Sequence, residues 1–254
     1  MNNGSSTSVV RGRDPRIRDY GVVVFAVLIA LLGALMMTIT SSAQMKGAAM
    51  LWVPAALQLM AGVWLGPVRG MIAGGIGAYA AGILAYGGWG LVDIIMNPIA
   101  GGVANSFLPG LLFQLFKIDP CFGLSKQNMH KAFFMSASLL IVVLFVGTLP
   151  VYTGIGKLAY LLAIVILLFG LPLVFRGASV AIAPLFVASL ICVFCCALSA
   201  LIGSYGVHLG GSAWKAALLG TGMGWFLGDT VSCFLGLYML AYYTEKARYV
   251  GLTR

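Results

Sequence analysis

Charged residues are scarce in this chain, and their scarcity decides its class. Only 8% of the 254 residues are charged and six are acidic, whereas 61% are hydrophobic. A soluble domain carries roughly 25% charged residues. This composition therefore excludes a globule that exposes its whole surface to water. Long polar linkers are also lacking, apart from a polar and basic stretch over 1–19.

Motifs for catalysis or for holding a metal or cofactor are lacking as well. The sequence contains no Gly-x-Ser-x-Gly elbow, no His-Glu-x-x-His pair and no phosphate-binding Gly-Lys-Ser/Thr loop. Four of the five cysteines lie within apolar runs, where Cys192-x-x-Cys195 has no second pair to complete a zinc site. We expect buried cysteines that pack as small hydrophobes, no metal, no cofactor and no enzyme activity. Uphill transport would need an ion gradient or a partner ATPase.

Apolar runs dominate what is present. Eight of them lie at approximately 20–40, 50–66, 70–87, 92–116, 132–150, 159–175, 178–203 and 215–243. Several approach the ~20 residues that a helix needs to cross a bilayer. The ~10-residue alternating segments of a transmembrane barrel do not occur. We predict an all-α, polytopic transmembrane helical bundle of six to eight spans in the cell membrane. It forms a single domain over 20–254, preceded by a disordered cytoplasmic tail over 1–19.

The positions of the basic residues predict the orientation of the bundle. Threading the eight runs alternately from a cytoplasmic N-terminus puts twelve Lys and Arg residues inside and three outside. Because cytoplasmic connections carry the excess of Lys and Arg, this predicts that both termini are cytoplasmic. Removing one adjacent pair of spans still leaves an even number of spans, so both termini stay on the same side. The net charge of +9 lies at membrane borders, so we predict contact with lipid and no nucleic-acid binding.

Small residues recur every four positions in two of the runs. Because small residues let helix backbones approach each other in lipid, both rows predict tight helix packing. The rows are Gly70, Gly74, Ala78 and Gly82 in the first, and Gly220, Gly224, Gly228, Ser232 and Gly236 in the second. Pro98 interrupts the apolar run 92–116. Such an interruption is tolerated where the freed backbone groups face protein or a wet cavity.

Polar side chains inside the apolar runs are the candidates for a binding site. Asp93 and Asp229 are the acidic residues there, and Asn97 and Asn105 follow Asp93 at helical spacing. An intramembrane carboxylate normally faces a cavity or a partner, so we predict an inward-facing polar stripe. Helix capping and structural hydrogen bonds are the alternatives. Acceptors outnumber donors in this set, which favours a ligand with amine, amide or cationic groups. Trp89 lies near the outer border, either as a belt anchor or as a wall over a bound ring.

Several of these segments resemble the substrate-binding S components of energy-coupling factor (ECF) transporters. The similar segments are 65–70 (Leu-Gly-Pro-Val-Arg-Gly), the Gly-rich 74–82, Ala26-x-x-x-Ala30-x-x-x-Ala34 and Trp225-x-x-Gly228-Asp229. The resemblance implies that Ala26, Ala30 and Ala34 dock a coupling transmembrane subunit, which acts with an ATPase pair. It also implies that the loop 41–49, with Gln44 and Lys46, closes over a vitamin-like molecule. S components usually have six helices, and the surplus here lies in 132–203.

The sequence thus predicts the membrane-embedded substrate-binding subunit of an ECF-type importer. A stand-alone secondary carrier or channel that uses an intramembrane Asp is the first alternative, and a non-transporting sensor or scaffold is the second. The predicted substrate-binding residues are Gln44, Lys46, Trp89, Asp93, Asn97, Asn105, Trp225 and Asp229.

Overall fold

The computed structural model describes residues 16–41, 52–87, 91–123 and 182–253, together with isolated positions between 138 and 170. Within these residues the chain forms helices and turns and no strand, which confirms the all-α prediction. The predicted runs 132–150 and 159–175 lie almost entirely outside the described residues.

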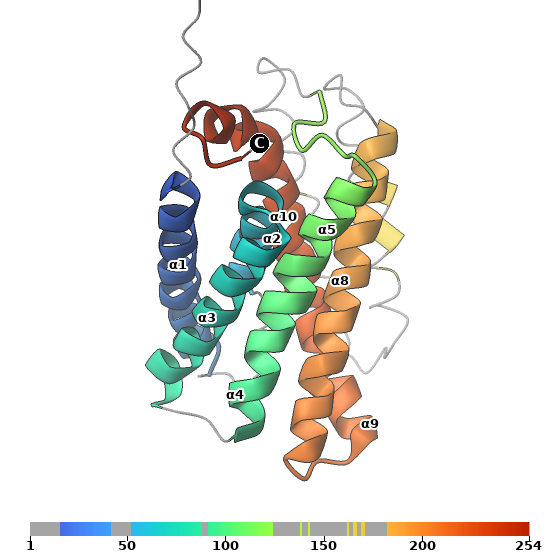
Figure 1. Cartoon of the computed structure of the whole chain (residues 1–254). Coiled ribbons are helices and arrows are strands. Elements are labelled where there is room, and N and C mark those ends of the chain that lie inside the picture. Colours follow the sequence, from blue (N-terminus) through green and yellow to red (C-terminus); the bar gives the residue numbers. More distant parts are fainter. Residues whose placement is uncertain are drawn as a thin grey trace, which may run out of the picture.

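The described helices run lengthwise beside one another in a bundle (Figure 1). In chain order they are α1 (Arg16–Ser41), α2 (Pro54–Leu65), α3 (Pro67–Tyr86), α4 (Leu91–Pro98), the π-helix η1 (Ile99–Phe107), α5 (Leu108–Leu115), α8 (Ile182–Leu209), α9 (Trp214–Ala217), the π-helix η3 (Leu218–Gly222) and α10 (Met223–Tyr249). The elements α4, η1 and α5 follow one another without a break and form one rod.

Four of the described helical segments are long and apolar enough to cross a membrane. They are Arg16–Thr38, Pro67–Ala85, Ala183–Leu209 and Trp214–Tyr249. Their length and composition support a membrane protein. The total of six to eight spans and the location in the cell membrane stay predictions.

Helix α2 lies at the centre of the bundle. It contacts α1, α3, η1, α5 and α10, and every residue in it except Val63 is buried. Its 12 residues are fewer than those of the predicted run 50–66, and they fall short of the ~20 residues that a helix needs to cross a bilayer. Gly66 ends α2 with a φ of 94°, a value that favours glycine, and Pro67 then begins α3. The chain therefore turns tightly between α2 and α3.

The small residues of α3 let three elements approach closely. A methyl group added to Gly70 would collide with the backbone of Gly62 in α2. A methyl group added to Gly74 would lie 2.7 Å from the carbonyl oxygen of Gly101 in η1. The predicted row of small residues is thus a packing seam that joins α3 to α2 and η1.

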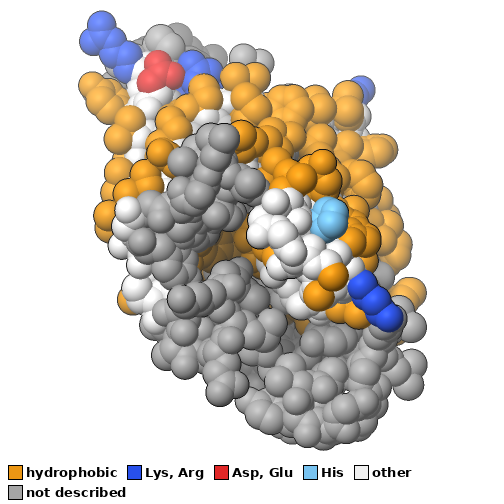
Figure 2. Space-filling model, turned by 90° about the horizontal axis from the view of Figure 1, so that it is seen from below, with side chains coloured by type: hydrophobic (Ala, Val, Ile, Leu, Met, Phe, Trp, Pro, Cys, Tyr) orange, Lys and Arg blue, Asp and Glu red, His pale blue; other side chains and the backbone are white. Residues whose placement is uncertain are grey.

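The two ends of the bundle differ in charge. Described basic side chains at the end where α1 and α3 begin and α5 and α10 finish are Arg16, Arg18, Arg69, Lys117, Lys246 and Arg248. The opposite end carries Lys215 and His208, and seen from there the described surface is mainly hydrophobic (Figure 2). The described chain starts and finishes at the basic end (Figure 1). That this end faces the cytoplasm stays a prediction.

Candidate functional site: a buried polar cluster

Four helical elements each contribute one polar side chain to the interior of the bundle. We call this set the polar cluster: Gln58 from α2, Asn105 from η1, Ser199 from α8 and Asp229 from α10. Asn105 Nδ2 and Ser199 Oγ each donate to Asp229 Oδ2 at 2.8 Å. Asn105 Nδ2 also lies 3.3 Å from Gln58 Oε1. All four side chains are buried.

The position of Asn105 depends on an unusual helix. Pro98 precedes the π-helix η1, and Pro109 follows it in the first turn of α5. Because proline has no amide hydrogen, the α-helical hydrogen bonds from residues 98 and 109 cannot form. The backbone between the two prolines instead adopts i→i+5 bonding, as in the bond from Leu108 N–H to Val103 O. Short π-helical segments inside α-helices are frequently found at functional sites.

Asp229 is the chemically distinctive member of the polar cluster. It is 3% exposed, and within the described residues it makes no salt bridge. Within the described residues its hydrogen bonds come from two neutral donors, Asn105 and Ser199. An intramembrane carboxylate without a basic partner is expensive to bury, so it marks a functional site by default.

Four buried polar atoms on the helices of the polar cluster and on α4 have no hydrogen-bond partner among the residues that the structure describes. They are Gln58 Nε2, Asn105 Oδ1, Asn97 Nδ2 and Ser232 Oγ, and each is buried. Buried polar groups are normally paired, so each unpaired atom needs an explanation. The group comprises two amide nitrogens, a carbonyl oxygen and a hydroxyl. The four atoms thus include both hydrogen-bond donors and hydrogen-bond acceptors.

The structure brings together two of the residues predicted from the sequence, Asn105 and Asp229, and adds two that were missed, Gln58 and Ser199. Gln58 had a signal, because it is the one amide side chain in the apolar run 50–66. Ser199 had none, because a serine in an apolar helix commonly bonds to its own backbone, as Ser189 and Ser204 do.

Two other predicted residues lie on the same two rods as Asn105 and Asp229. Asn97 is buried at the end of α4, eight residues before Asn105 along the same rod. Trp225 lies one turn before Asp229 on α10, and a methyl group added to Gly203 of α8 would lie 2.5 Å from its ring. Trp225 thus forms the next layer between α8 and α10, on the side nearer Lys215.

The remaining predicted substrate-binding residues are not placed in the site. Gln44, Lys46 and Trp89 lie outside the described residues. Asp93 belongs to α4, but its side chain is outside the described part. Their roles stay predictions.

The predicted docking residues lie on the side of α1 that faces the bundle. Ala30 is buried, Ala26 and Ala34 are half-buried, and a methyl group on Gly77 of α3 would lie 2.9 Å from the carbonyl oxygen of Ala26. The opposite face of α1 is exposed and apolar, with Val23, Val24, Val27, Leu28, Leu31 and Leu35. The row therefore serves internal packing, and its docking role stays a prediction.

Buried cysteines lie one helical turn from the polar cluster. Cys195 precedes Ser199 on α8, Cys233 follows Asp229 on α10, and Cys196 Sγ lies 3.6 Å from Cys233 Sγ. All are free thiols. Among the residues that the structure describes, no group of three or more His, Cys, Asp or Glu side chains is placed to hold a metal ion.

Comparisons with protein-family models, curated proteins and solved structures gave no match for this chain.

Proposed function

We propose that this protein is the membrane-embedded substrate-binding subunit of an importer of the ECF type, and that the polar cluster holds its substrate. The convergence of Gln58, Asn105, Ser199 and Asp229 from four helices is the observation that carries the proposal. A packed bundle gains little from burying a carboxylate that has no basic partner among the described residues, together with four polar atoms that lack hydrogen bonds there. A bound polar molecule would satisfy those groups.

The unpaired atoms favour one class of substrate chemistry. Gln58 Nε2 and Asn97 Nδ2 are donors, Asn105 Oδ1 is an acceptor, and Ser232 Oγ can do either. Asp229 adds a carboxylate. A small, vitamin-like molecule with amide or amine groups beside carbonyl oxygens matches this set. Because donors are present as well as acceptors, a neutral heterocyclic amide fits better than a simple cation.

The experiment is a ligand screen followed by one charge-removing substitution. Purified protein in detergent is screened against water-soluble vitamins by thermal shift, and the hit is measured by calorimetry. Asp229→Asn keeps the side-chain size and one acceptor oxygen but removes the charge. We expect affinity to fall about tenfold or more, because hydrogen bonds to charged groups contribute about 1.5–3 kcal/mol.

Ser189→Ala is the matched control for this substitution. Ser189 is also buried, but its hydroxyl donates to Leu185 O of its own helix and not to the polar cluster. The Ser189→Ala variant should bind the screened ligand with the affinity of the wild type. Equal affinity in Asp229→Asn and the wild type would refute the placement of the substrate. Co-purification with a coupling subunit and an ATPase pair tests the importer assignment separately.

A stand-alone carrier coupled to an ion gradient is the second candidate. Asp229, held by neutral donors without a basic partner among the described residues, is the kind of group that such carriers use. Uptake by the purified chain in liposomes, abolished by an uncoupler and by Asp229→Asn, would select this candidate. Uptake that requires added ATPase subunits would select the first.

A further inference from the structure

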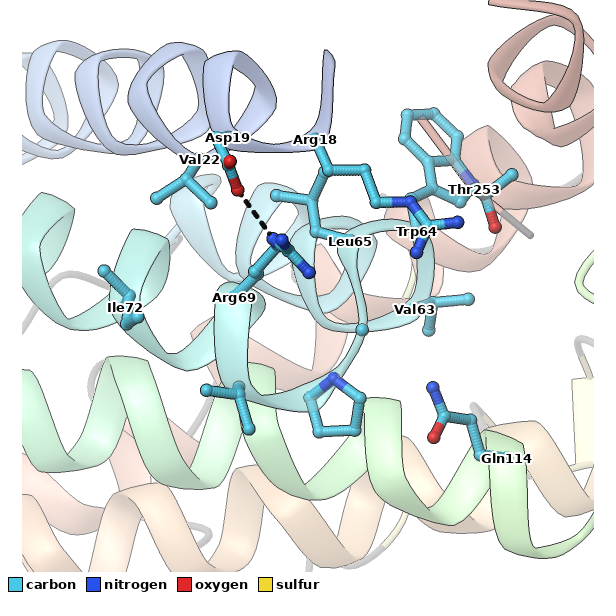
Figure 3. A pocket seen from close by; sticks show the side chains of 13 residues that line it. Arg18, Asp19, Val22, Val63, Trp64, Leu65, Arg69, Ile72, Gln114 and Thr253 are labelled. Atoms are coloured by element: carbon cyan, nitrogen blue, oxygen red, sulfur yellow. Dashed lines mark hydrogen bonds and ion pairs between the residues drawn. The ribbon is translucent and has the colours of Figure 1, made fainter. Parts of the chain in front are cut away.

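A pocket of about 610 Å³ lies at the basic end of the bundle, far along the helices from the polar cluster. Its walls come from the start of α1, the α2–α3 turn, the end of α5 and the last described residues (Figure 3). Its lining residues include Arg18, Asp19, Val68, Arg69, Ile72 and Gln114.

Two guanidinium groups give the pocket a positive charge. Arg18 extends from α1 toward Thr253, and Arg69 extends from α3 toward α1 (Figure 3). Arg69 Nε binds Asp19 Oδ1 at 2.9 Å, which engages one of the five N–H donors of that guanidinium. The two arginines against one aspartate leave a net charge of +1 among the lining residues. The uncharged Gln114 adds an amide on the α5 side.

The same pocket has an apolar side that continues onto the outer surface of α3. Val68 and Ile72 line it and are 59% and 43% exposed. Tyr20, Val23 and Val24 on α1 are also exposed at this level. The occupant that fits such a site carries an anionic group on an apolar body. A free anion would use the arginines but not the apolar side.

We propose that this pocket binds an anionic phospholipid, with the headgroup phosphate between Arg18 and Arg69 and the acyl chains along Val68 and Ile72. Guanidinium groups match phosphate geometry through paired N–H donors. Basic pockets between membrane helices, on the side where basic residues gather, are suited to anionic headgroups. This proposal is independent of the substrate-binding function and of the polar cluster.

Native mass spectrometry of the full chain tests the proposal. The protein is placed in nanodiscs of mixed phosphatidylcholine and phosphatidylglycerol, released, and its retained lipids are counted. We expect selective retention of phosphatidylglycerol. Arg18→Gln and Arg69→Gln should each reduce that retention about fivefold, equivalent to about 1 kcal/mol for one basic residue at an anionic surface.

Lys246→Gln is the matched control, because it also removes one positive charge from the basic end. Lys246 lies outside the pocket, with its Nζ 5.0 Å from the Tyr242 ring centroid. Retention should stay at the wild-type level. Equal losses in all three variants would mean general charge attraction and would overturn the site.

A second variant keeps the test decisive if Arg69→Gln fails to fold without its partner Asp19. Gln114 is exposed, so Gln114→Glu should fold while placing a negative charge in the pocket. We expect several-fold lower phosphatidylglycerol retention. Unchanged retention would overturn the proposal. Displacement of the lipid by millimolar inorganic phosphate would also overturn it, because the site would then take a soluble anion.

Discussion

Ser199 and Ser232 are both buried serines beside Asp229, yet they are bonded differently. Ser199 Oγ donates to Asp229 Oδ2, whereas Ser232 Oγ has no hydrogen-bond partner in the described part of the chain. In a protein built only for stability, an unpaired buried hydroxyl brings no gain. Substituting each of these two serines therefore distinguishes a side chain that stabilises the fold from one that is available to a ligand.

We predict that the two serine-to-alanine substitutions differ in their effect on stability. Ser199→Ala removes a donor from a buried carboxylate and should lower the free energy of unfolding by about 1 kcal/mol. Ser232→Ala removes an unpaired hydroxyl and should leave the free energy of unfolding unchanged or slightly raised. Reversible unfolding in mixed micelles with increasing dodecyl sulfate measures both.

We also predict an effect of the Ser232 substitution on ligand binding. Ser232→Ala should weaken binding of the screened ligand although the protein is no less stable, because the ligand would lose its contact with the hydroxyl. A stable Ser232→Ala protein with wild-type affinity would show that this hydroxyl lies outside the binding site.

At the scale of the element, neighbouring glycines of α3 face different surroundings. Gly74 packs against Ser106 and Gly101 of η1, with Gly101 O 2.7 Å from the position of an added Cβ. Gly75 has its nearest neighbour, Pro98 O, at 3.4 Å, an ordinary van der Waals contact. Alanine favours a helix over glycine by about 1 kcal/mol at either position, so helix propensity cancels between them.

We predict that Gly74→Ala destabilises the bundle by about 2 kcal/mol, because the close contact of α3 with η1 must open. Gly75→Ala should be neutral or stabilising. Thermal unfolding of the two variants in the same detergent gives the comparison. Similar melting temperatures for both would mean that α3 and η1 are not packed as closely as described.

The η1 segment links this seam to the polar cluster. Its Gly101 faces α3, and its Asn105 faces Gln58 and Asp229. An opening of the α3–η1 contact would therefore also shift Asn105. We expect Gly74→Ala to weaken ligand binding more than Gly75→Ala, although neither residue lies in the polar cluster.

At the scale of the whole molecule, the basic end defines the orientation to be tested. Cys121 lies there, in the turn after α5, with Asp119 and Arg248 around it. Ser212 lies at the opposite end, between α8 and α9, and is exposed. If the basic end is cytoplasmic, a membrane-impermeant maleimide applied to intact cells should label Ser212→Cys and spare Cys121.

The protonation of Cys121 sets the conditions for this experiment. Burial raises the pKa of the Cys121 thiol, and the neighbouring Asp119 carboxylate raises it further. Because the thiolate is the reactive form, labelling of Cys121 should be slow at neutral pH and should accelerate as pH rises past the ordinary thiol range. Permeabilised cells at alkaline pH are the positive control. Labelling of Cys121 in intact cells at that pH would mean that the basic end faces the outside of the cell.

Local features of the sequence predicted much of the fold. The scarcity of charge and the apolar runs predicted helices, which the structure contains. The four-residue spacing of Gly70 and Gly74 predicted a packing seam, which the structure also contains. All of these features can be seen within short stretches of sequence. Asn105 and Asp229 were predictable for the same reason, because a polar side chain in an apolar run must turn inward.

Tertiary structure alone decided which polar groups meet. The hydrogen bonds of the polar cluster join residues 30, 47, 94 and 124 positions apart, and no local pattern encodes such pairs. It also decided that the short helix α2 lies at the centre, which made Gln58 a partner of Asn105. Arg18 and Arg69, which lie far apart in the sequence, likewise came to line one pocket. Composition fixes what must be buried, whereas helix packing selects the neighbours.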